Sequence, residues 1–337
     1  MSAARAAFSA DEIDALLRPL GRAKSVLIAV SGGPDSTALL VMAAEWAKRS
    51  GTAIAAATVD HGLRPESAAE AEGVAGLCRR LRVPHATLAW RGAKPATRLQ
   101  ERAREARYRL LIAHARAIGA DMIATAHHAD DQAETVLFRL LRGSGVAGLR
   151  GMDLLSERDG VAIARPLIGV SKSELVAFCR ARGVAFIDDP SNADPRFART
   201  RLRALIARLA EEGFDAEALD RLARRASETE EALMRLTTLV EERLGASGPV
   251  DARALFAEPI VIAERVLARR IAAAGERDES RIGLEKIEAL ARRLREAVVE
   301  GRPLSANVGG ALVRLTGKGG LSFGPEPKRR REAGSRP

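Results

Sequence analysis

A short turn with the sequence SGGPDS combines two glycines, two serines and one aspartate, and it carries the clearest chemical signal in this chain. The glycines lack a Cβ atom, so the backbone can adopt positive φ values and let phosphate oxygens approach its amide groups. The serines add hydroxyl donors. Asp35 would repel bound phosphates unless a cation such as Mg²⁺ lay between them. The turn therefore predicts a site for a nucleoside triphosphate and magnesium. The residues expected to line it are Ser31, Gly32, Gly33, Pro34, Asp35 and Ser36.

The segments on either side of the turn agree with this interpretation. Residues 26–30 form an apolar, β-branched run of strand length, and residues 37–46 have helical character. A strand, a glycine turn and a helix place backbone N–H groups and the positive end of the helix against a phosphate. The turn matches neither G-x-x-x-x-G-K-[ST] nor G-x-G-x-x-G. The alternative is a glycine-rich turn that binds no ligand.

A second polar cluster, HHADDQAE at residues 127–134, follows another apolar run at 122–126. Histidine, aspartate and glutamate at the end of a strand can hold Mg²⁺ or polarise a leaving group. The alternative is structural, with Asp130 or Asp131 capping a helix that begins near Gln132. Both interpretations can hold at once. Four glycines between 143 and 151 then predict a mobile loop over the site.

Asp60 ends a further apolar run at residues 52–59. In open α/β sheets, ligands collect at the carboxyl ends of the strands. We therefore expect Asp60 near the nucleotide, with a turn cap as the alternative.

The order of the segments predicts the fold class. Apolar runs at 26–30, 52–59, 85–90 and 122–126 alternate with helical segments, which favours an α/β fold with a parallel sheet and helices on both faces. From about residue 213 the pattern becomes mostly helical, with weak strand signals only near 311–316 and 320–323. We expect a smaller, mostly helical second domain. Its expected helices cover 215–244, 252–274 and 281–299.

The charge balance favours an anionic partner. The chain has 54 Lys and Arg against 44 Asp and Glu, a formal charge of +10, which suits nucleic acid before membrane. An acid-free stretch at 196–209 contains Arg199, Arg201 and Arg203 and is typical of a contact with RNA phosphate or ATP, or of a solvated helix face. The absence of a signal peptide or a long apolar run predicts a cytosolic protein.

Several motifs together resemble the tRNA(Ile)-lysidine synthetases, a family of PP-loop ATP pyrophosphatases. The motifs are SGGPDS (31–36), VDHGLRPES (59–67), the block 127–152, ARPL (164–167) and DDPSN…RTRLR (188–203). The resemblance implies an enzyme that uses ATP and L-lysine to convert the wobble cytidine of tRNA(Ile) with a CAU anticodon to lysidine. An adenylated cytidine would form first, with release of pyrophosphate and then AMP.

The same resemblance assigns roles to residues. Asp35 and Asp131 would hold Mg²⁺, and with Glu134 and Arg199 they would form the catalytic set. Asp60 and His127 would join the ATP site. The expected substrate contacts are Arg107, Arg142, Arg201 and Arg203.

The change of composition near residue 213 and the resemblance together imply a domain plan. Residues 1–212 would form the catalytic domain, 213–324 a helical tRNA-binding domain and 325–337 a basic, disordered tail. A second subunit in a homodimer is one way to add tRNA contacts.

Two other functions remain open at this point. A PP-loop tRNA thiolase normally uses paired cysteines, whereas Cys78 and Cys179 are far apart in sequence and form no C-x-x-C. A non-catalytic RNA-binding module would gain nothing from clustered carboxylates, because RNA is itself an anion.

Overall fold

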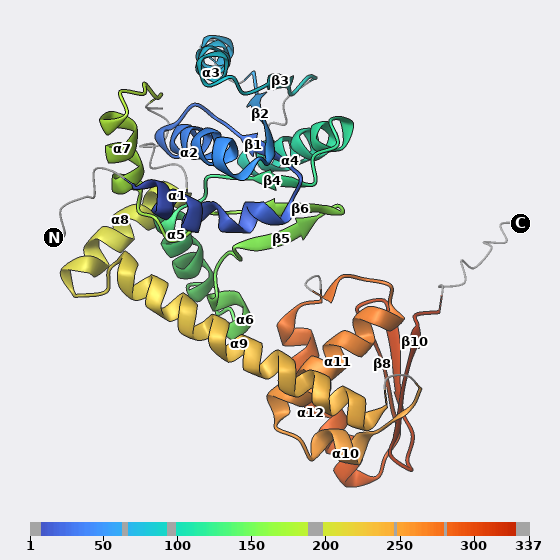
Figure 1. Cartoon of the computed structure of the whole chain (residues 1–337). Helices are drawn as coiled ribbons and strands as arrows, with labels where there is room; N and C mark the ends of the chain where they lie inside the picture. The colour runs from blue at the N-terminus through green and yellow to red at the C-terminus, as the bar shows by residue number, and fades with distance from the viewer. Residues whose placement is uncertain are drawn as a thin grey trace, which may run out of the picture. The chain divides into compact units, whose positions relative to one another are not determined.

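The computed structural model describes residues 8–62, 67–92, 99–187, 198–245, 248–279 and 282–327. The chain divides into two compact units, which meet in sequence at residues 227 and 228. Each unit has its own buried core. Figure 1 shows the helices and strands of both units. The expected basic tail lies outside the described residues from position 328 onward.

The first unit is built on a six-stranded sheet with the order β3-β2-β1-β4-β6-β5. All neighbouring strands are parallel except β5, which pairs antiparallel with β6. The strands are β1 (Ser25–Ala29), β2 (Ala53–Asp60), β3 (His85–Ala89), β4 (Met122–Ala124), β5 (Leu155–Arg158) and β6 (Val161–Ala164). The predicted α/β class with a parallel sheet is confirmed.

The helices of this unit agree with the alternation expected from the sequence. They are α1 (Ala10–Leu17), the 3-10 helix η1 (Arg18–Arg22), α2 (Pro34–Ser50), α3 (Ser67–Leu81), α4 (Leu99–Ala117), α5 (Ala129–Leu140), α6 (Val146–Leu149), α7 (Lys172–Ala181), α8 (Ala198–Glu211) and α9 (Ala216–Leu244). Helix α9 runs through the boundary between the two units. No helix in the described ranges is long and apolar enough to cross a membrane.

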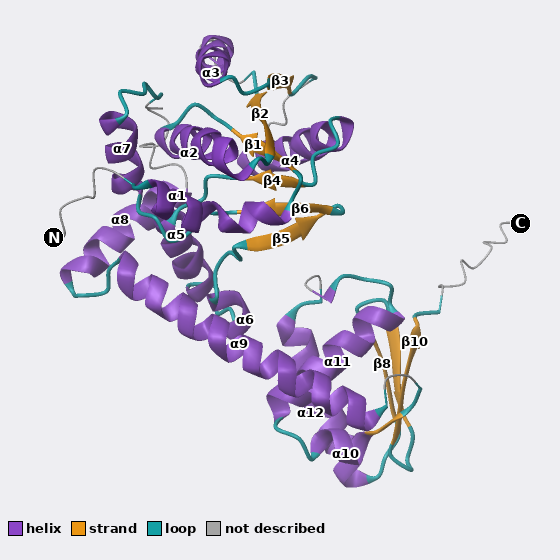
Figure 2. Cartoon of the chain, viewed as in Figure 1, coloured by secondary structure: helices purple, strands orange, loops and turns teal. Residues whose placement is uncertain are grey.

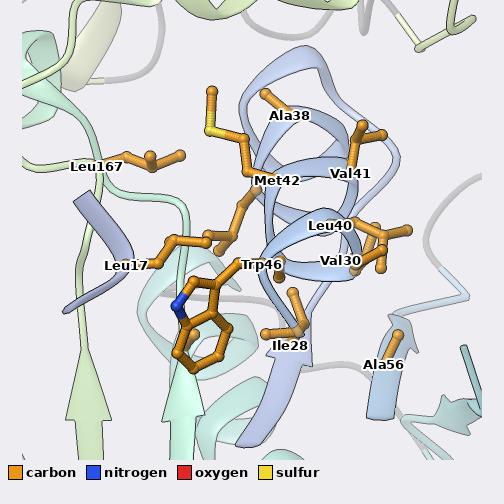
Figure 3. Close-up of a cluster of buried hydrophobic side chains, with 14 of the residues drawn as sticks. Leu17, Ile28, Val30, Ala38, Leu40, Val41, Met42, Trp46, Ala56 and Leu167 are labelled. Carbon is orange, nitrogen blue, oxygen red and sulfur yellow. The ribbon is translucent and has the colours of Figure 1, made fainter. Parts of the chain in front are cut away.

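Strand β1 is buried on both faces because its side chains alternate between two helical layers. Val26 and Ile28 belong to the core that contains α1, α2 and α7, whereas Leu27 belongs to the core that contains α4. Figure 3 shows Ile28 beneath helix α2, close to Leu40 and Trp46. Helices therefore cover both faces of the sheet, and β1 is fixed in its centre.

The second unit combines helices with a four-stranded antiparallel sheet in the order β7-β10-β9-β8 (Figure 2). Its elements are α10 (Ala252–Phe256), α11 (Ile260–Ala274), α12 (Leu284–Glu300), β7 (Val250–Asp251), β8 (Leu304–Val308), β9 (Ala311–Leu315) and β10 (Gly320–Pro325). The strands expected near 311–316 and 320–323 correspond to β9 and β10, and β7 and β8 complete the sheet. The helix expected over 252–274 is interrupted, because Pro259 caps α11 and separates it from α10.

A buried ion pair joins α9 to α11 inside the second unit. Arg265 donates from both terminal nitrogens to the two carboxylate oxygens of Glu230, at 2.7 and 2.6 Å. The side chain of Glu230 is 6% exposed and that of Arg265 is 20% exposed. Removing one partner would leave a buried charge without compensation.

Glu230→Ala is therefore expected to lower the free energy of unfolding of the second unit by about 3 kcal/mol. Glu217→Ala, on the same helix, is the control because Glu217 makes a largely exposed pair with Arg221. It should cost less than about 1 kcal/mol. Urea unfolding followed by circular dichroism measures both. Equal losses would show that the pair with Arg265 contributes nothing particular.

Candidate active site

The two polar clusters found in the sequence meet because β1 and β4 are neighbouring parallel strands. Parallel strands end at the same edge of a sheet, so the segments that follow β1 and β4 lie side by side there. The first segment leads into α2 and contains Asp35. The second leads into α5 and contains Asp131 and Glu134.

The loop after β1 turns sharply into α2. Gly32 has φ +87°, in the left-handed region that favours glycine, and Gly33 is the extended N-cap of the helix. Pro34 occupies the first turn, where a missing N–H costs nothing. The loop therefore presents the amino end of a 17-residue helix to its ligand side, as an anion site requires.

Serine and threonine hydroxyls brace this loop. The Ser36 hydroxyl accepts from the Ser31 N–H at 3.1 Å and donates to the Gly33 carbonyl at 3.1 Å. Since its proton is used there, the Ser31 hydroxyl donates to the Ser36 oxygen, also at 3.1 Å. The Thr37 hydroxyl donates to the Gly32 carbonyl at 3.2 Å. Ser31 is exposed and Ser36 is buried, so the two serines differ in access to a ligand.

Gly32 is also held from outside the loop. The Ile187 N–H donates to the Gly32 carbonyl at 2.9 Å. A Cβ atom on Gly32 would lie 2.4 Å from Cδ1 of Ile187 and 3.3 Å from a methyl group of Val74. The positive φ favours glycine at this position, and a Cβ atom would also force the end of the Ile187 side chain to move.

His128 stands at the centre of the carboxylates. Its Nε2 lies 3.5 Å from an oxygen of Asp35 and 3.5 Å from an oxygen of Asp131, and its Nδ1 lies 3.4 Å from an oxygen of Asp130. Its backbone N–H also donates to Asp131 at 3.3 Å, as the N-cap of α5. The expectation that Asp130 or Asp131 caps a helix beginning near Gln132 is wrong, because α5 begins at Ala129 and both acids lie in its first turn. Asp131 still accepts from the N-cap N–H, in the reciprocal half of a capping box.

The charge state of this cluster follows from its contacts. Burial lowers the pKa of His128, but hydrogen bonding to Asp130 and Asp35 and the charge of Asp131 outweigh it and raise the pKa to about 10. Hydrogen bonding to His128 lowers the pKa of Asp130 to about 2. His128 is therefore an imidazolium at neutral pH. Sequence reasoning included His128 in the cluster 127–134 but gave it no role, because its role depends on which carboxylates surround it.

The two expected magnesium ligands fit a shared cation. Oxygens of Asp35 and Asp131 contact the same His128 nitrogen, so they lie at most twice 3.5 Å apart. The other Asp35 oxygen is buried and has no hydrogen-bond partner among the described residues. In that part of the chain, no three His, Cys, Asp or Glu side chains converge as a preformed metal site. Mg²⁺ typically takes one or two carboxylates and completes its shell with phosphates and water, which matches this donor set.

Glu134 and Arg203 form one unit. Glu134 is buried on α5, and the Arg203 guanidinium on α8 donates to it through Nε. The structure therefore brings an expected substrate-binding arginine to an expected catalytic carboxylate. Arg199 lies in the first turn of α8, and its side chain is outside the described residues.

His127 is held in a defined orientation. It is buried at the end of β4, and its Nδ1 lies 2.8 Å from the Thr125 hydroxyl. That hydroxyl donates to the Ala164 carbonyl at 3.3 Å, so its oxygen accepts the hydrogen bond from the His127 Nδ1–H.

The other expected site residues have contacts of their own. Asp60 ends β2 and accepts from the Gly62 N–H at 2.8 Å, the turn cap named as its alternative. Arg107 stacks on the Tyr108 ring at 5.5 Å, and Arg142 stacks on the Phe138 ring at 4.1 Å. Among the described residues, neither arginine contacts the cluster around His128. Arg201 is exposed on α8.

The glycine-rich loop after α5 is tied to that helix. Gln132 donates to the carbonyls of Arg150 and Met152 at 3.3 and 3.1 Å and accepts from the Met152 N–H at 2.7 Å. Arg139 donates to the carbonyls of Gly148 and Gly151 at 2.8 and 2.6 Å. The segment expected to be mobile therefore has fixed contacts and includes the short helix α6.

The fold and the phosphate loop define an ATP-binding PP-loop protein. The PP-loop domain family matches residues 7–209 of this chain. Among solved structures, the U34-tRNA thiolase NcsA from Methanococcus maripaludis superposes with a TM-score of 0.55 at 17% identity, covering 65% of this chain and 78% of that one. At this identity the likeness concerns the fold alone.

Comparison with curated relatives identifies the family within the PP-loop proteins. The tRNA(Ile)-lysidine synthase of Methylobacterium nodulans is 49% identical over 328 residues, covering 95% of this chain and 96% of its own. That of Rhodopseudomonas palustris is 47% identical over 339 residues, covering 96% and 97%. The chain belongs to the tRNA(Ile)-lysidine synthase family of PP-loop proteins, and the resemblance seen in the sequence motifs is confirmed.

Gly32→Ala is expected to lower the free energy of unfolding by about 1–3 kcal/mol, because it strains the backbone and collides with Ile187. Gly33→Ala is the matched control, since its Cβ would find only the Ser31 hydroxyl at 3.8 Å. Urea unfolding without nucleotide compares the two variants. Equal stability would contradict the tight approach at Gly32.

His128 should make stability depend on pH in a defined direction. Its folded pKa of about 10 exceeds the unfolded value near 6.5, so its contribution is complete below about pH 6.5 and is lost as the pH rises toward 10. The stability difference between the native protein and His128→Gln should shrink between these values, by up to about 1.4 kcal/mol per pH unit.

Urea unfolding at several pH values in EDTA measures this difference. His85→Gln is the control, because burial lowers the pKa of His85. A difference for His128→Gln that stays constant from pH 6.5 to 10 would contradict the charged cluster.

Proposed function

We propose that this protein is an enzyme that joins L-lysine to C2 of the wobble cytidine of tRNA(Ile) with a CAU anticodon, at the expense of ATP. The observation that carries the proposal is the 47–49% identity to lysidine synthases over nearly the whole length of both chains. The paired carboxylates beside an ATP-type phosphate loop support it, because they suit chemistry at a phosphate.

The reaction proceeds in two balanced steps. The C2 oxygen of cytidine attacks the α-phosphorus of ATP, the bond to the β-phosphate breaks, and pyrophosphate leaves. The ε-amine of lysine then attacks C2, the C2–O bond breaks, and AMP departs with the cytidine oxygen. One amine proton is released as the new C–N bond forms.

Each residue of the site has its own role in this proposed reaction. The loop from Ser31 to Ser36 binds the phosphates through its N–H groups and the amino end of α2. Asp35 and Asp131 would hold Mg²⁺, which would stabilise the negative charge of the leaving pyrophosphate. His128 keeps both carboxylates in place through its Nε2. Glu134, buried and paired with Arg203, lies on the same helix as Asp131.

The arginines and the second unit are assigned to RNA. The positive charge of the chain favours a phosphate-rich partner, and Arg142 and Arg201 are exposed on the first unit. Arg107, half-buried against Tyr108, completes the proposed substrate set. The proposal includes residues 213–324 as a tRNA-binding domain after a catalytic domain at 1–212. It also includes a cytoplasmic location, where tRNA, ATP and free lysine meet.

Sulfur transfer is the nearest competing chemistry in this fold. The archaeal thiolase with the similar fold carries a 4Fe–4S cluster. Such clusters are normally held by four cysteine thiolates, and this chain has two cysteines. Both are buried, and burial raises the pKa of each thiol to about 11, which opposes thiolate chemistry.

The test incubates the protein with ATP, Mg²⁺ and unmodified tRNA(Ile), and measures the pyrophosphate released from ATP. A second measurement follows the transfer of labelled lysine to the RNA. Release should require the tRNA, and labelling should require both substrates. Asp35→Asn and Asp131→Asn should each lower kcat about 100-fold or more, since they remove a magnesium ligand. Asp159→Asn is the control, because Asp159 is exposed in the β5–β6 turn at φ +49°, which asparagine also tolerates.

Three outcomes would contradict the proposal. Full pyrophosphate release by either site variant would remove the assigned role of the carboxylates. Release without lysine transfer would indicate another PP-loop RNA modifier. Binding of tRNA without any release would indicate a non-catalytic RNA-binding module.

A further inference from the structure

Helix α8 packs against helix α5 through an apolar contact inside the first unit. Leu202 of α8 is buried in one cluster with Ala133, Val136 and Leu137 of α5. Leu205, Ile206 and Leu209 of α8 extend this contact. The contact covers the middle and the end of α8, and the basic first turn precedes it.

One ion pair lies at the border of this contact. The side chain of Glu134 is 3% exposed, and that of Arg203, which donates to it, is 37% exposed. A carboxylate this deeply buried is unfavourable unless a cation or donors compensate for it. Arg203 supplies that compensation from α8, so its guanidinium fixes the rotation of α8 against α5.

The position of the pair matters for the residue one turn earlier. Arg199 and Arg203 are four residues apart, and residues at this spacing lie on the same face of a helix. Helix α8 begins at Ala198, so Arg199 depends on the next turn for its placement. The pair of Arg203 with Glu134 therefore sets the position of the first turn of α8 relative to α5.

We propose that Arg203 is a positioning residue, which holds α8 against α5 through Glu134 and so fixes the first turn of α8, the turn that carries the expected catalytic residue Arg199. This differs from the direct contact with RNA that the arginine-rich sequence favours. The inference rests on the proposed function for its kinetic consequence. Its structural part, the anchoring of α8, stands independently of that function.

The kinetic arm compares Arg203→Ala, Arg203→Lys and the control Arg208→Ala in tRNA-dependent pyrophosphate release. Arg208 is an exposed arginine near the end of the same helix. Arg203→Ala should lower kcat roughly 10- to 100-fold, the effect of a small misplacement of a catalytic group. The KM of Arg203→Ala for tRNA should stay within about twofold of the native value. The kcat of Arg203→Lys should lie between those of Arg203→Ala and the native protein. Arg208→Ala should keep the native kcat.

The structural arm measures hydrogen–deuterium exchange of the α8 amides in the free protein. Arg203→Ala should speed exchange at residues 198–205 and leave α2 unchanged. Glu134→Gln should speed the same amides, and the double variant should add little to either single change, because both act through one pair.

The outcomes separate this inference from the proposed function. If Arg203→Ala raises only the KM for tRNA and leaves kcat and α8 exchange unchanged, Arg203 is a direct RNA contact and the inference is overturned. Additive effects of the two substitutions would also overturn it. If the native protein forms no lysidine, the proposed function fails, and the exchange arm alone decides whether Arg203 anchors α8. If Arg203→Ala does not fold, the same measurements are made on Arg203→Lys, which keeps the positive charge at this position.

Discussion

The position of β1 between β2 and β4 is the constraint on which the site depends. The chain builds β2 and β3 on one side of β1 and then returns to place β4 on the other side. The loops that follow β1 and β4 consequently meet at a point where the strand order reverses, which is where open α/β sheets bind ligands. Asp35 and Asp131 are 96 positions apart in sequence, yet both contact the same nitrogen of His128.

Charge compensation explains how so many acids can share this edge. Three carboxylates surround His128, and like charges at this spacing would otherwise oppose one another. The imidazolium offsets one of these three negative charges, and Arg203 offsets the charge of Glu134 one helical turn further along α5. Each of these two cations also joins two elements of the fold. His128 links α2 with α5, and Arg203 links α8 with α5.

Sequence reasoning found the elements and the acids because their signals are local. The run 26–30 with its glycine turn predicts β1 and the loop, and the block 127–134 predicts the second half of the site. His128 and the partner of Arg203 could not be predicted in this way, since their roles depend on which distant side chains surround them. Strand β5 was missed because it is a short edge strand with a polar sequence, LSER. The sheet of the second unit is likewise built from short strands, although the glycine pair Gly309–Gly310, both at positive φ, was a usable hairpin signal.

The most direct test of the account follows the oxygen of the wobble cytidine. Unmodified tRNA(Ile) with ¹⁸O at C2 of that cytidine is incubated with the protein, ATP, Mg²⁺ and lysine, and the products are analysed by mass spectrometry. Attack of this oxygen on the α-phosphorus predicts that the label appears in AMP and is absent from pyrophosphate. Label that stays in the RNA or passes to water, with unlabelled AMP, would contradict adenylation of the cytidine at the paired carboxylates.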